Sequence, residues 1–221
     1  MSRVMKAVSA RLLVALAITL VWAAQADAVQ LGNPAPDIKK GDFAIGLGLS
    51  DHRTTALFDW GIIESGVLRF LAGSFDGGFK SNGTEIGVGY RHNLGPKFDI
   101  GKFPASLGIL AQYQLAKVEQ EFFNPIIGRN DKVEFKTNII DVGFGGSITP
   151  VESLNTYAAL VYERAQYDQN LPLFGKVSAS DSKVGALLGA EYWIASSFVA
   201  GLELHPGLFD DDVSIFAEFK F

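Results

Sequence analysis

Most of the chain alternates between bulky apolar residues and small or polar residues with a period of two. Residues 43–50 show the pattern, because Phe43, Ile45, Leu47 and Leu49 share one face and Ala, Gly and Ser residues share the other. Alternation with this period predicts β-strands, since successive side chains of a strand point to opposite faces. The chain has 24 glycines, many of them inside these stretches, where they would destabilise a helix.

Ten stretches follow this pattern, two of them (66–75 and 155–165) less regularly. A strand that crosses a bilayer needs about 9–11 residues, which matches their lengths. The two longest connections, near 116–132 and 166–181, are polar and are predicted to be loops on the same side. The connections on the opposite side are mostly tight turns, and this asymmetry is typical of outer-membrane barrels. The predicted strands are 42–50, 54–62, 66–75, 84–93, 103–115, 133–148, 155–165, 182–193, 197–205 and 212–221.

The N-terminus is set apart by a different pattern. Arg3, Lys6 and Arg11 precede an uncharged apolar run over residues 12–24, and Ala26-Asp27-Ala28 follows. A basic start, a short apolar stretch and a small-x-small tripeptide indicate a secretory signal peptide over residues 1–28. A membrane-spanning helix is the alternative, but it needs about 20 apolar residues. Cleavage would remove three basic residues and one acid, and the net charge would change from −5 to −7.

The composition of the two faces favours a membrane over water as the surroundings. In a soluble sandwich or barrel the polar face should be rich in Lys, Glu and Thr, whereas here it is largely Gly, Ala and Ser with scattered charges. Small side chains suit a narrow lumen. Beyond the signal no stretch is long enough for a transmembrane helix, and only helices and closed barrels satisfy the backbone in lipid. The sequence therefore predicts an all-β fold, a closed antiparallel up-and-down transmembrane barrel forming one domain over residues 29–221. Ten strands are expected; eight are the alternative, with residues 54–75 in doubt.

The last residues carry a family resemblance. Val213, Ile215, Ala217, Phe219 and Phe221 alternate with other residues up to the C-terminus. This segment resembles the C-terminal strand of Gram-negative outer-membrane proteins, and in size and hairpin layout the chain is similar to small barrels of the OmpX and OmpW type. The resemblance implies a bacterial outer-membrane location. It also implies that the barrel-assembly machinery reads Phe219 and Phe221 as an assembly signal.

Charged residues on the small-residue face are candidates for the lumen. Charges in a narrow, poorly hydrated lumen must pair with one another. Two interpretations remain open, a selective pore for small solutes and a salt-bridged interior that holds the barrel shut; the second is favoured, because a barrel of this size is filled by side chains. The predicted lumen charges are Arg69, Glu85, Arg91, Asp141, Glu191, Glu203, Glu218 and Lys220.

Aromatic residues recur near one end of almost every predicted strand. Trp and Tyr favour the membrane–water interface, and barrels carry aromatic girdles there. With both chain ends in the periplasm, these residues are predicted to form the periplasmic girdle. They are Phe43, Trp60, Tyr90, Phe103, Phe144, Tyr157, Tyr192 and Phe198.

One group of polar residues suggests chemistry at the outer rim. The first and last strands of a closed barrel are neighbours, so Asp51 and His52 could meet His205 and residues 210–212, which are three aspartates. Such a group could form a hydrolytic or divalent-cation site, although acidic loops are usually just solvated. The sequence contains no His-x-Ser, the pairing of the lipid-A-modifying barrels, so we assign no catalytic residue and no metal ligand.

These observations leave several functions open. A structural, adhesive or surface-binding barrel with a largely plugged lumen is preferred, and the alternatives are a narrow channel, an outer-membrane lipid hydrolase or acyltransferase, and a soluble periplasmic barrel that binds an apolar ligand. The expected partners are outer-membrane lipid, lipopolysaccharide and the assembly machinery, around a monomer. The absence of cysteine excludes thiol chemistry and a lipoprotein anchor, the negative charge argues against nucleic acid, and no cofactor is expected.

Overall fold

The computed structural model describes residues 30–76, 82–124, 129–171, 175–209 and 213–221, and they form one antiparallel sheet that closes on itself. In the described ranges no helix is long and apolar enough to span a membrane. The strands are β1 (Phe43–Ser50), β2 (Arg53–Ile63), β3 (Gly66–Asp76), β4 (Asn82–Asn93), β5 (Phe98–Ile100), β6 (Phe103–Asn124), β7 (Arg129–Val151), β8 (Leu154–Leu171), β9 (Gly175–Ala195), β10 (Phe198–Leu204) and β11 (Val213–Lys220).

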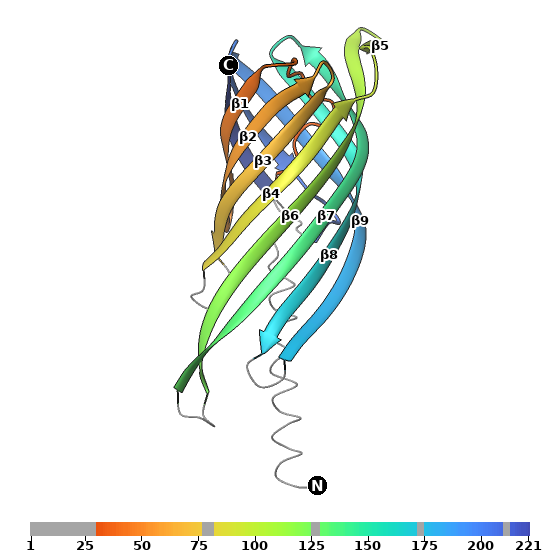
Figure 1. Cartoon of the computed structure of the whole chain (residues 1–221). Coiled ribbons are helices and arrows are strands. Elements are labelled where there is room, and N and C mark those ends of the chain that lie inside the picture. The colour runs from red at the N-terminus through yellow and green to blue at the C-terminus, as the bar shows by residue number, and fades with distance from the viewer. Residues whose placement is uncertain (1–29, 77–81, 125–128, 172–174, 210–212) are drawn as a thin grey trace.

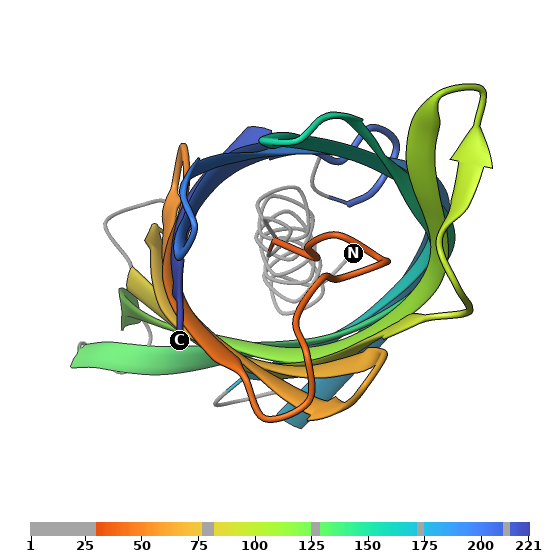
Figure 2. The same cartoon turned by 90° about the horizontal axis from the view of Figure 1, so that it is seen from above.

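Ten of these strands form the barrel wall. Each pairs with its sequence neighbour, β4 pairs directly with β6, and β1 pairs with β11 to close the ring (Figures 1 and 2). At the seam, backbone hydrogen bonds of 2.8 and 3.4 Å join Phe43 and Phe221 in both directions. β5 lies outside the ring and pairs only with the start of β6. The prediction of ten strands is confirmed, because residues 54–75 hold both β2 and β3.

The prediction of two long polar loops is wrong. β6 and β7 continue as a paired ladder to Asn124 and Arg129, and β8 and β9 to Leu171 and Gly175. These long hairpins extend the barrel wall at one end, as the lower part of Figure 1 shows, whereas the C-terminus lies at the other end. Polar residues break the apolar alternation and so look like loops in the sequence, but they can form strands where both faces lie outside lipid.

The outer surface carries a continuous apolar band. Along β1 the outward residues are exposed and the inward residues are largely buried, and the same alternation runs around the barrel. Leu47 is 57% exposed and Leu160 is 68% exposed, values that are unfavourable in water. Other exposed members of the band are Ile45, Phe58, Phe70, Ile86, Ile109, Ile140, Val142, Val184, Leu202 and Ile215.

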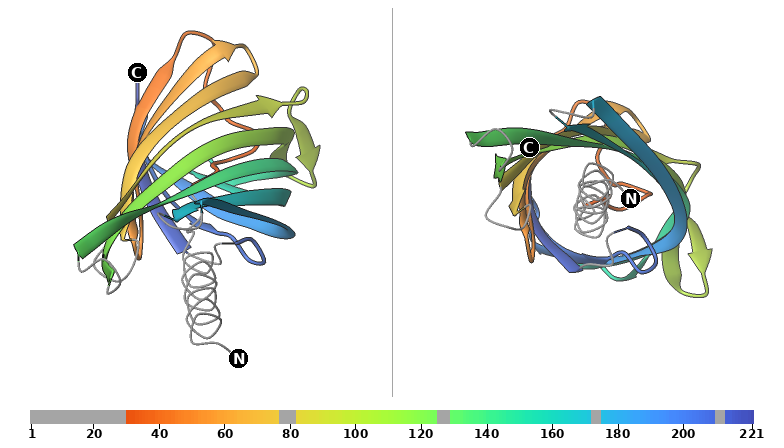
Figure 3. Two further views of the ribbon diagram at one scale, coloured as in Figure 1. Left: turned by 60° about the horizontal axis from the view of Figure 1, so that its bottom comes forward. Right: turned by 90° about the horizontal axis from the view of Figure 1, so that it is seen from below.

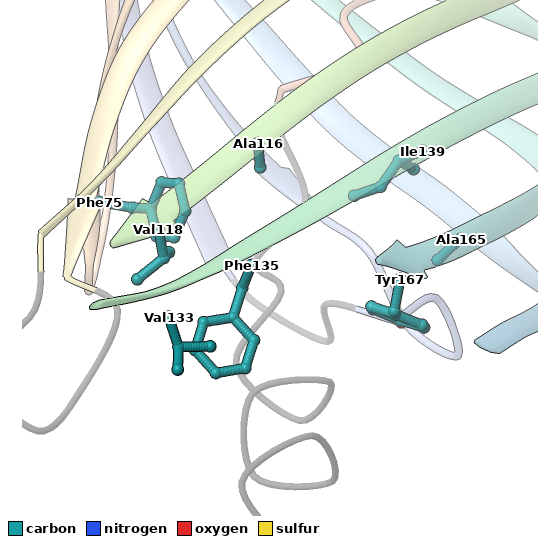
Figure 4. Close-up of a cluster of buried hydrophobic side chains, with 8 residues drawn as sticks. All are labelled: Phe75, Ala116, Val118, Val133, Phe135, Ile139, Ala165 and Tyr167. Carbon is teal, nitrogen blue, oxygen red and sulfur yellow. The ribbon is translucent and has the colours of Figure 1, made fainter. Parts of the chain in front are cut away.

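The polarity of the wall inverts along the long strands. Beyond Tyr113 on β6 and Tyr162 on β8, the outward side chains become Lys117, Glu119 and Arg164. The inner face of the same region carries a buried apolar cluster, drawn in Figure 4. Its members are Phe75, Ala116, Val118, Val133, Phe135, Ile139, Ala165 and Tyr167. Apolar residues inside and charges outside are the arrangement of a wall in water, so the inversion marks where the apolar band ends.

Residues 30–39, which we call the strap, run inside the barrel. Figures 2 and 3 show this segment, drawn in red to orange, within the ring of strands. Gln30, Leu31, Asn33 and Ala35 are almost fully buried. The strap turns back into β1 through hydrogen bonds from the Asp42 N–H to the Lys39 carbonyl and from the Gly41 N–H to the Gly61 carbonyl.

Candidate functional site in the barrel lumen

The inward side chains of β2, β3, β4 and β11 form a compensated ion network. Arg69 donates to both oxygens of Asp59 at 2.7 Å and to Glu218 at 2.7 Å, and Arg91 donates to Asp59 as well. Arg53 pairs with Glu85 at 3.2 Å. All six side chains are buried. Three arginines therefore face three carboxylates, and this wall, which we call the paired wall, carries no net charge.

The neighbouring wall, formed by β7 to β10, has a different balance. Its inward carboxylates include Asp141, Glu163, Glu191 and Glu203, and His205 lies just after β10. Lys183 lies on the same face, opposite Glu163 in the ladder, with its Nζ 4.6 Å from the ring centre of Phe209. The His205 Nε2 lies 3.3 Å from the Glu203 Oε2. Glu163 accepts a hydrogen bond from the Phe209 N–H at 2.6 Å. We call this side the acidic wall, because the described structure gives none of its four carboxylates an arginine or lysine within ion-pair distance.

The strap is held by hydrogen bonds to charged side chains. The N–H groups of Leu31 and Gly32 donate to the two carboxylate oxygens of Glu203 at 3.1 and 2.8 Å. Arg69 donates to the Gln30 carbonyl at 3.4 Å, and the Asn33 amide donates to Glu191 at 3.4 Å. The strap backbone thus supplies donors to the acidic wall and an acceptor to the paired wall.

Two features fit the strap to this position. Gly32 has φ +79°, and a Cβ there would lie 2.5 Å from the Nη1 of Arg91 and 2.8 Å from the Nη1 of Arg69. Only glycine combines this backbone conformation with so close an approach. Leu31 packs into an apolar niche that includes Leu110 and Leu187. One apolar anchor and one glycine therefore set how the strap lies in the lumen.

Tyr157 completes the coordination of Glu203. Its hydroxyl donates to the Glu203 Oε1 at 2.6 Å, and the side chain is 4% exposed. The prediction that Tyr157 belongs to the aromatic girdle is wrong. The outward face of β8 holds Ala158, Leu160 and Tyr162, so residue 157 points inward by the alternation of the strand.

We expect Tyr157→Phe to lower the free energy of unfolding by about 1.5–3 kcal/mol, because it removes a hydrogen bond to a buried charged group. Urea unfolding of the refolded barrel in detergent micelles measures this change. Tyr162→Phe is the control, since Tyr162 lies on the same strand and is 45% exposed; a change within about 0.5 kcal/mol is expected there. Equal losses for the two variants would contradict the role given to Tyr157.

The predicted lumen charges fall on both walls. Arg69, Glu85, Arg91 and Glu218 belong to the paired wall. Asp141, Glu191 and Glu203 belong to the acidic wall, where Glu191 is half-buried. Lys220 shares the inward face of Glu218 and lies at the mouth on the C-terminal side, with its Nζ 4.0 Å from the ring centre of Trp193. The residues that the sequence analysis missed are Arg53, Asp59, Glu163, Tyr157 and the strap.

The other predicted girdle residues lie near the end of the barrel where the chain terminates. Phe43, Trp60, Phe144 and Tyr192 are exposed, whereas Tyr90, Phe103 and Phe198 are half-buried. Phe219 and Phe221 are exposed too, and Phe221 stacks on Phe43 with ring centres 4.9 Å apart. That the girdle residues lie at the membrane surface stays a prediction. That the assembly machinery reads Phe219 and Phe221 stays a prediction as well.

The group suggested for the outer rim does not assemble. His205 points into the lumen and is 1% exposed, next to Glu203, whereas Asp51 and His52 lie in an exposed turn. Residues 210–212 lie outside the described residues. Among the residues that are described, no group of three or more His, Asp or Glu could hold a metal ion.

A cavity of about 510 Å³ opens beside the strap at the short-turn end. Ala35, Pro36 and Asp37 of the strap line one side, and Glu191 and Trp193 of β9 are among the residues on the other. The strap therefore leaves space next to the acidic wall at this mouth.

The outer face of the long hairpins is charged and water-exposed. Lys117 lies between Glu119 at 3.0 Å and Glu134 at 2.8 Å. The hydrogen bonds that Lys117 donates to Glu134 and then to Glu119 raise the pKa of Lys117, and the hydrogen bonds that Glu134 accepts from Lys117 and Lys136 lower the pKa of Glu134. The pKa of Asp168 is lowered first by its hydrogen bond from Ser178. These side chains stay charged at neutral pH.

A closed antiparallel barrel with an apolar outer band and a charged interior defines the class of this protein: it is a transmembrane β-barrel of the outer-membrane type. No protein-family model matches the chain, and no curated protein matches it either. Two similar solved structures are both of Ail, the attachment invasion locus protein of Yersinia pestis, one of them in complex with the heparin analogue sucrose octasulfate. They share 13% identity with this chain over 82% of its length and 99% of theirs, with TM-scores of 0.41 and 0.39. At these values the similarity says nothing of what this chain binds.

Proposed function

We propose that this chain is a bacterial outer-membrane barrel with a sealed lumen, whose long-strand end serves as a binding surface outside the cell. The observation that carries the proposal is the inversion of polarity along β6 to β9. The outward side chains of these strands change from apolar to charged, as expected where the barrel wall emerges from the membrane into water on that side. The opposite end has short turns and carries the C-terminus, as expected of a periplasmic side.

The surface-binding role rests on the shape and chemistry of this end. The four longest strands, β6 to β9, raise the wall beyond the apolar band on one side of the barrel (Figure 1). Arg164 and Lys136 lie on the outer face just beyond the band, where cationic side chains would meet lipopolysaccharide phosphates. A rigid, charged wall outside the membrane suits adhesion or attachment to surface polysaccharide better than it suits catalysis.

The sealed lumen rests on the strap and the ion network. The strap enters at the short-turn end and runs inside the ring (Figure 2), and six buried charges of the paired wall bind one another rather than water. His205 is engaged with Glu203, so no residue of the interior is assigned a catalytic role. We further propose that residues 1–28 are a cleaved export signal, that Phe219 and Phe221 are read by the barrel-assembly machinery, and that the barrel is a monomer.

The orientation is testable because the chain contains no cysteine. We expect Ser180→Cys, at an exposed site on the β9 extension, to react in intact cells with a membrane-impermeant maleimide. Ser196→Cys, in the exposed β9–β10 turn, should react only after the outer membrane is permeabilised. Both variants should fractionate with the outer membrane and shift in mobility on boiling. Labelling of both in intact cells, or recovery in the soluble fraction, would contradict the proposal.

A further inference from the structure

One hairpin at the short-turn end leaves the barrel wall. The ladder between β4 and β6 ends at Asn93, and the ladder between β5 and β6 begins at Phe98. Residues 94–97 therefore oppose only residues 106–107, and such an excess of residues bends a strand out of regular pairing. Figure 2 shows that β5 lies outside the ring of strands as a result. We call residues 94–103 the flap.

The flap has an apolar outer face. Phe98 lies directly opposite Ala105 in the ladder, and Ile100 lies directly opposite Phe103. Directly opposite residues of paired strands point to the same side of a sheet. Ala105 and Phe103 continue the outward row of β6 that includes Ile109 of the apolar band. Phe98 is 42% exposed and Ile100 is 56% exposed, so the outer face of the flap extends the surface that meets lipid.

The other face of the flap is polar. Asp99 lies opposite Pro104, which lines the cavity at the short-turn mouth. Lys97 and Lys102, at the two ends of β5, line this cavity as well. Lys97 lies 3.4 Å from Asp37 of the strap, but both side chains are more than half exposed, and an exposed ion pair contributes little stability. Both ammonium groups are therefore available to an anion on the water side of the flap.

These two faces match the chemistry of a membrane surface. A strand that bends outward from the wall turns its outer face toward the bilayer and its inner face toward water. Apolar side chains of such an element lie just below the lipid head groups. Lysines at its ends extend their ammonium groups to the phosphates, and anionic lipids attract these lysines more strongly than zwitterionic lipids do.

We propose that the flap is a lipid-binding element, which places Phe98 and Ile100 among the lipids of the adjoining leaflet and binds anionic phospholipid head groups through Lys97 and Lys102. A protein partner would fit a bounded patch, whereas this face runs without a break into the apolar band. The leaflet is the periplasmic one by the orientation proposed above, on which this part of the proposal rests.

A tryptophan reporter in the flap tests the contact with lipid. Trp60→Phe and Trp193→Phe remove the two tryptophans of the mature chain, and Phe98→Trp then places a reporter on the outer face. The barrel is refolded in vesicles of phosphatidylcholine whose acyl chains carry bromine near the head group. We expect several-fold weaker fluorescence than in vesicles without bromine. Asp99→Trp in the same background is the matched control on the opposite face, and acrylamide in the water should quench it while bromine should not.

The same reporter tests the two lysines. Phosphatidylcholine and phosphatidylglycerol are mixed in one fixed ratio, and bromine is carried by either lipid in turn. Quenching at residue 98 should be stronger when phosphatidylglycerol carries the bromine, and Lys97→Gln with Lys102→Gln should abolish this excess. Lys39→Gln with Lys40→Gln removes the same charge from exposed positions where the strap joins β1, and the excess should survive there.

The results that contradict the lipid contact are distinct. Quenching of the reporter at residue 98 by acrylamide rather than by bromine would mean that the flap lies in water. Quenching by neither would mean that a protein surface covers it, and either result overturns the contact. If Phe98→Trp lacks the mobility shift on boiling, Ile100→Trp, on the same face, takes its place.

The other parts of the proposal fail separately. Equal quenching by the two brominated lipids, or an excess that survives the loss of Lys97 and Lys102, overturns the anionic head-group site. Labelling of Ser196→Cys in intact cells overturns the proposed orientation and with it the choice of leaflet, whereas the vesicle experiment does not depend on orientation.

Discussion

Replacement of Arg69 by methionine is expected to destabilise the barrel by about 3–5 kcal/mol, the usual effect of breaking a buried ion pair by removing one partner. Arg69 is 1% exposed and binds both Asp59 and Glu218. Methionine preserves much of the side-chain volume but leaves Glu218 without its ion-pair partner. Asp59 keeps Arg91, so the main consequence falls on Glu218.

A second substitution separates the buried charge from other effects. In Arg69→Met with Glu218→Gln, the uncompensated carboxylate is gone, and Asp59 and Arg91 still pair. We expect this double variant to recover a large part of the lost free energy of unfolding, measured by urea unfolding of the refolded barrel in micelles. If the double variant is as unstable as the single one, the role of Arg69 is packing rather than charge compensation.

The strand pattern could be predicted from the sequence because the bilayer imposes it. Lipid requires bulky apolar residues on one face, and the narrow lumen requires small or polar residues on the other, so a period of two appears even in strands as short as β1 and β10. The number of strands and the inward position of Arg69 and Glu203 follow from that alternation. Residues 54–75 were in doubt because Arg69 lies among apolar neighbours; its partners, Asp59 and Glu218, come from other strands.

The ends of the long hairpins could not be predicted by the same rule. Beyond the apolar band the constraint from lipid disappears. There Lys117 pairs with Glu134, and Asp168 pairs with Lys176, across neighbouring strands whose sequence looks like a polar loop. The inner apolar cluster around Phe135 and Tyr167 was the available signal, since apolar residues still alternate with these charges. Tyr157 was misplaced for a related reason, because an aromatic residue near a strand end fits a girdle as well as it fits a lumen.

The strap could not be predicted because it has no periodic pattern. Its position depends on contacts with residues far away in the sequence, chiefly Glu203, 172 residues from Leu31. Such contacts link the N-terminal segment to strands β9 and β10, which come late in the sequence. The interior can therefore reach its final arrangement only when the last strands have paired, and closure of the ring at Phe43 and Phe221 and seating of the strap are expected to occur together.

A charge placed in the middle of the apolar band gives the second large effect. Leu47 lies near the centre of β1, is 57% exposed and pairs with Ala56 and Ala217. Arginine at the bilayer midplane of a barrel costs about 2–4 kcal/mol, so we expect Leu47→Arg to lower the free energy of unfolding in lipid vesicles by about that amount. The reason is the removal of the guanidinium from water, because Leu47 has little packing to lose.

The control places the same residue where the wall is expected to meet water. Gln166→Arg lies on the outer, exposed face of the β8 extension, and its effect should stay within about 0.5 kcal/mol. The difference between the two variants should also shrink when lipid is replaced by a detergent with short chains, since a thin, mobile layer lets the arginine reach water more easily. Equal effects at the two sites in lipid would mean that the outer face of β1 does not contact the bilayer core. The apolar band would then have to be covered by another protein surface.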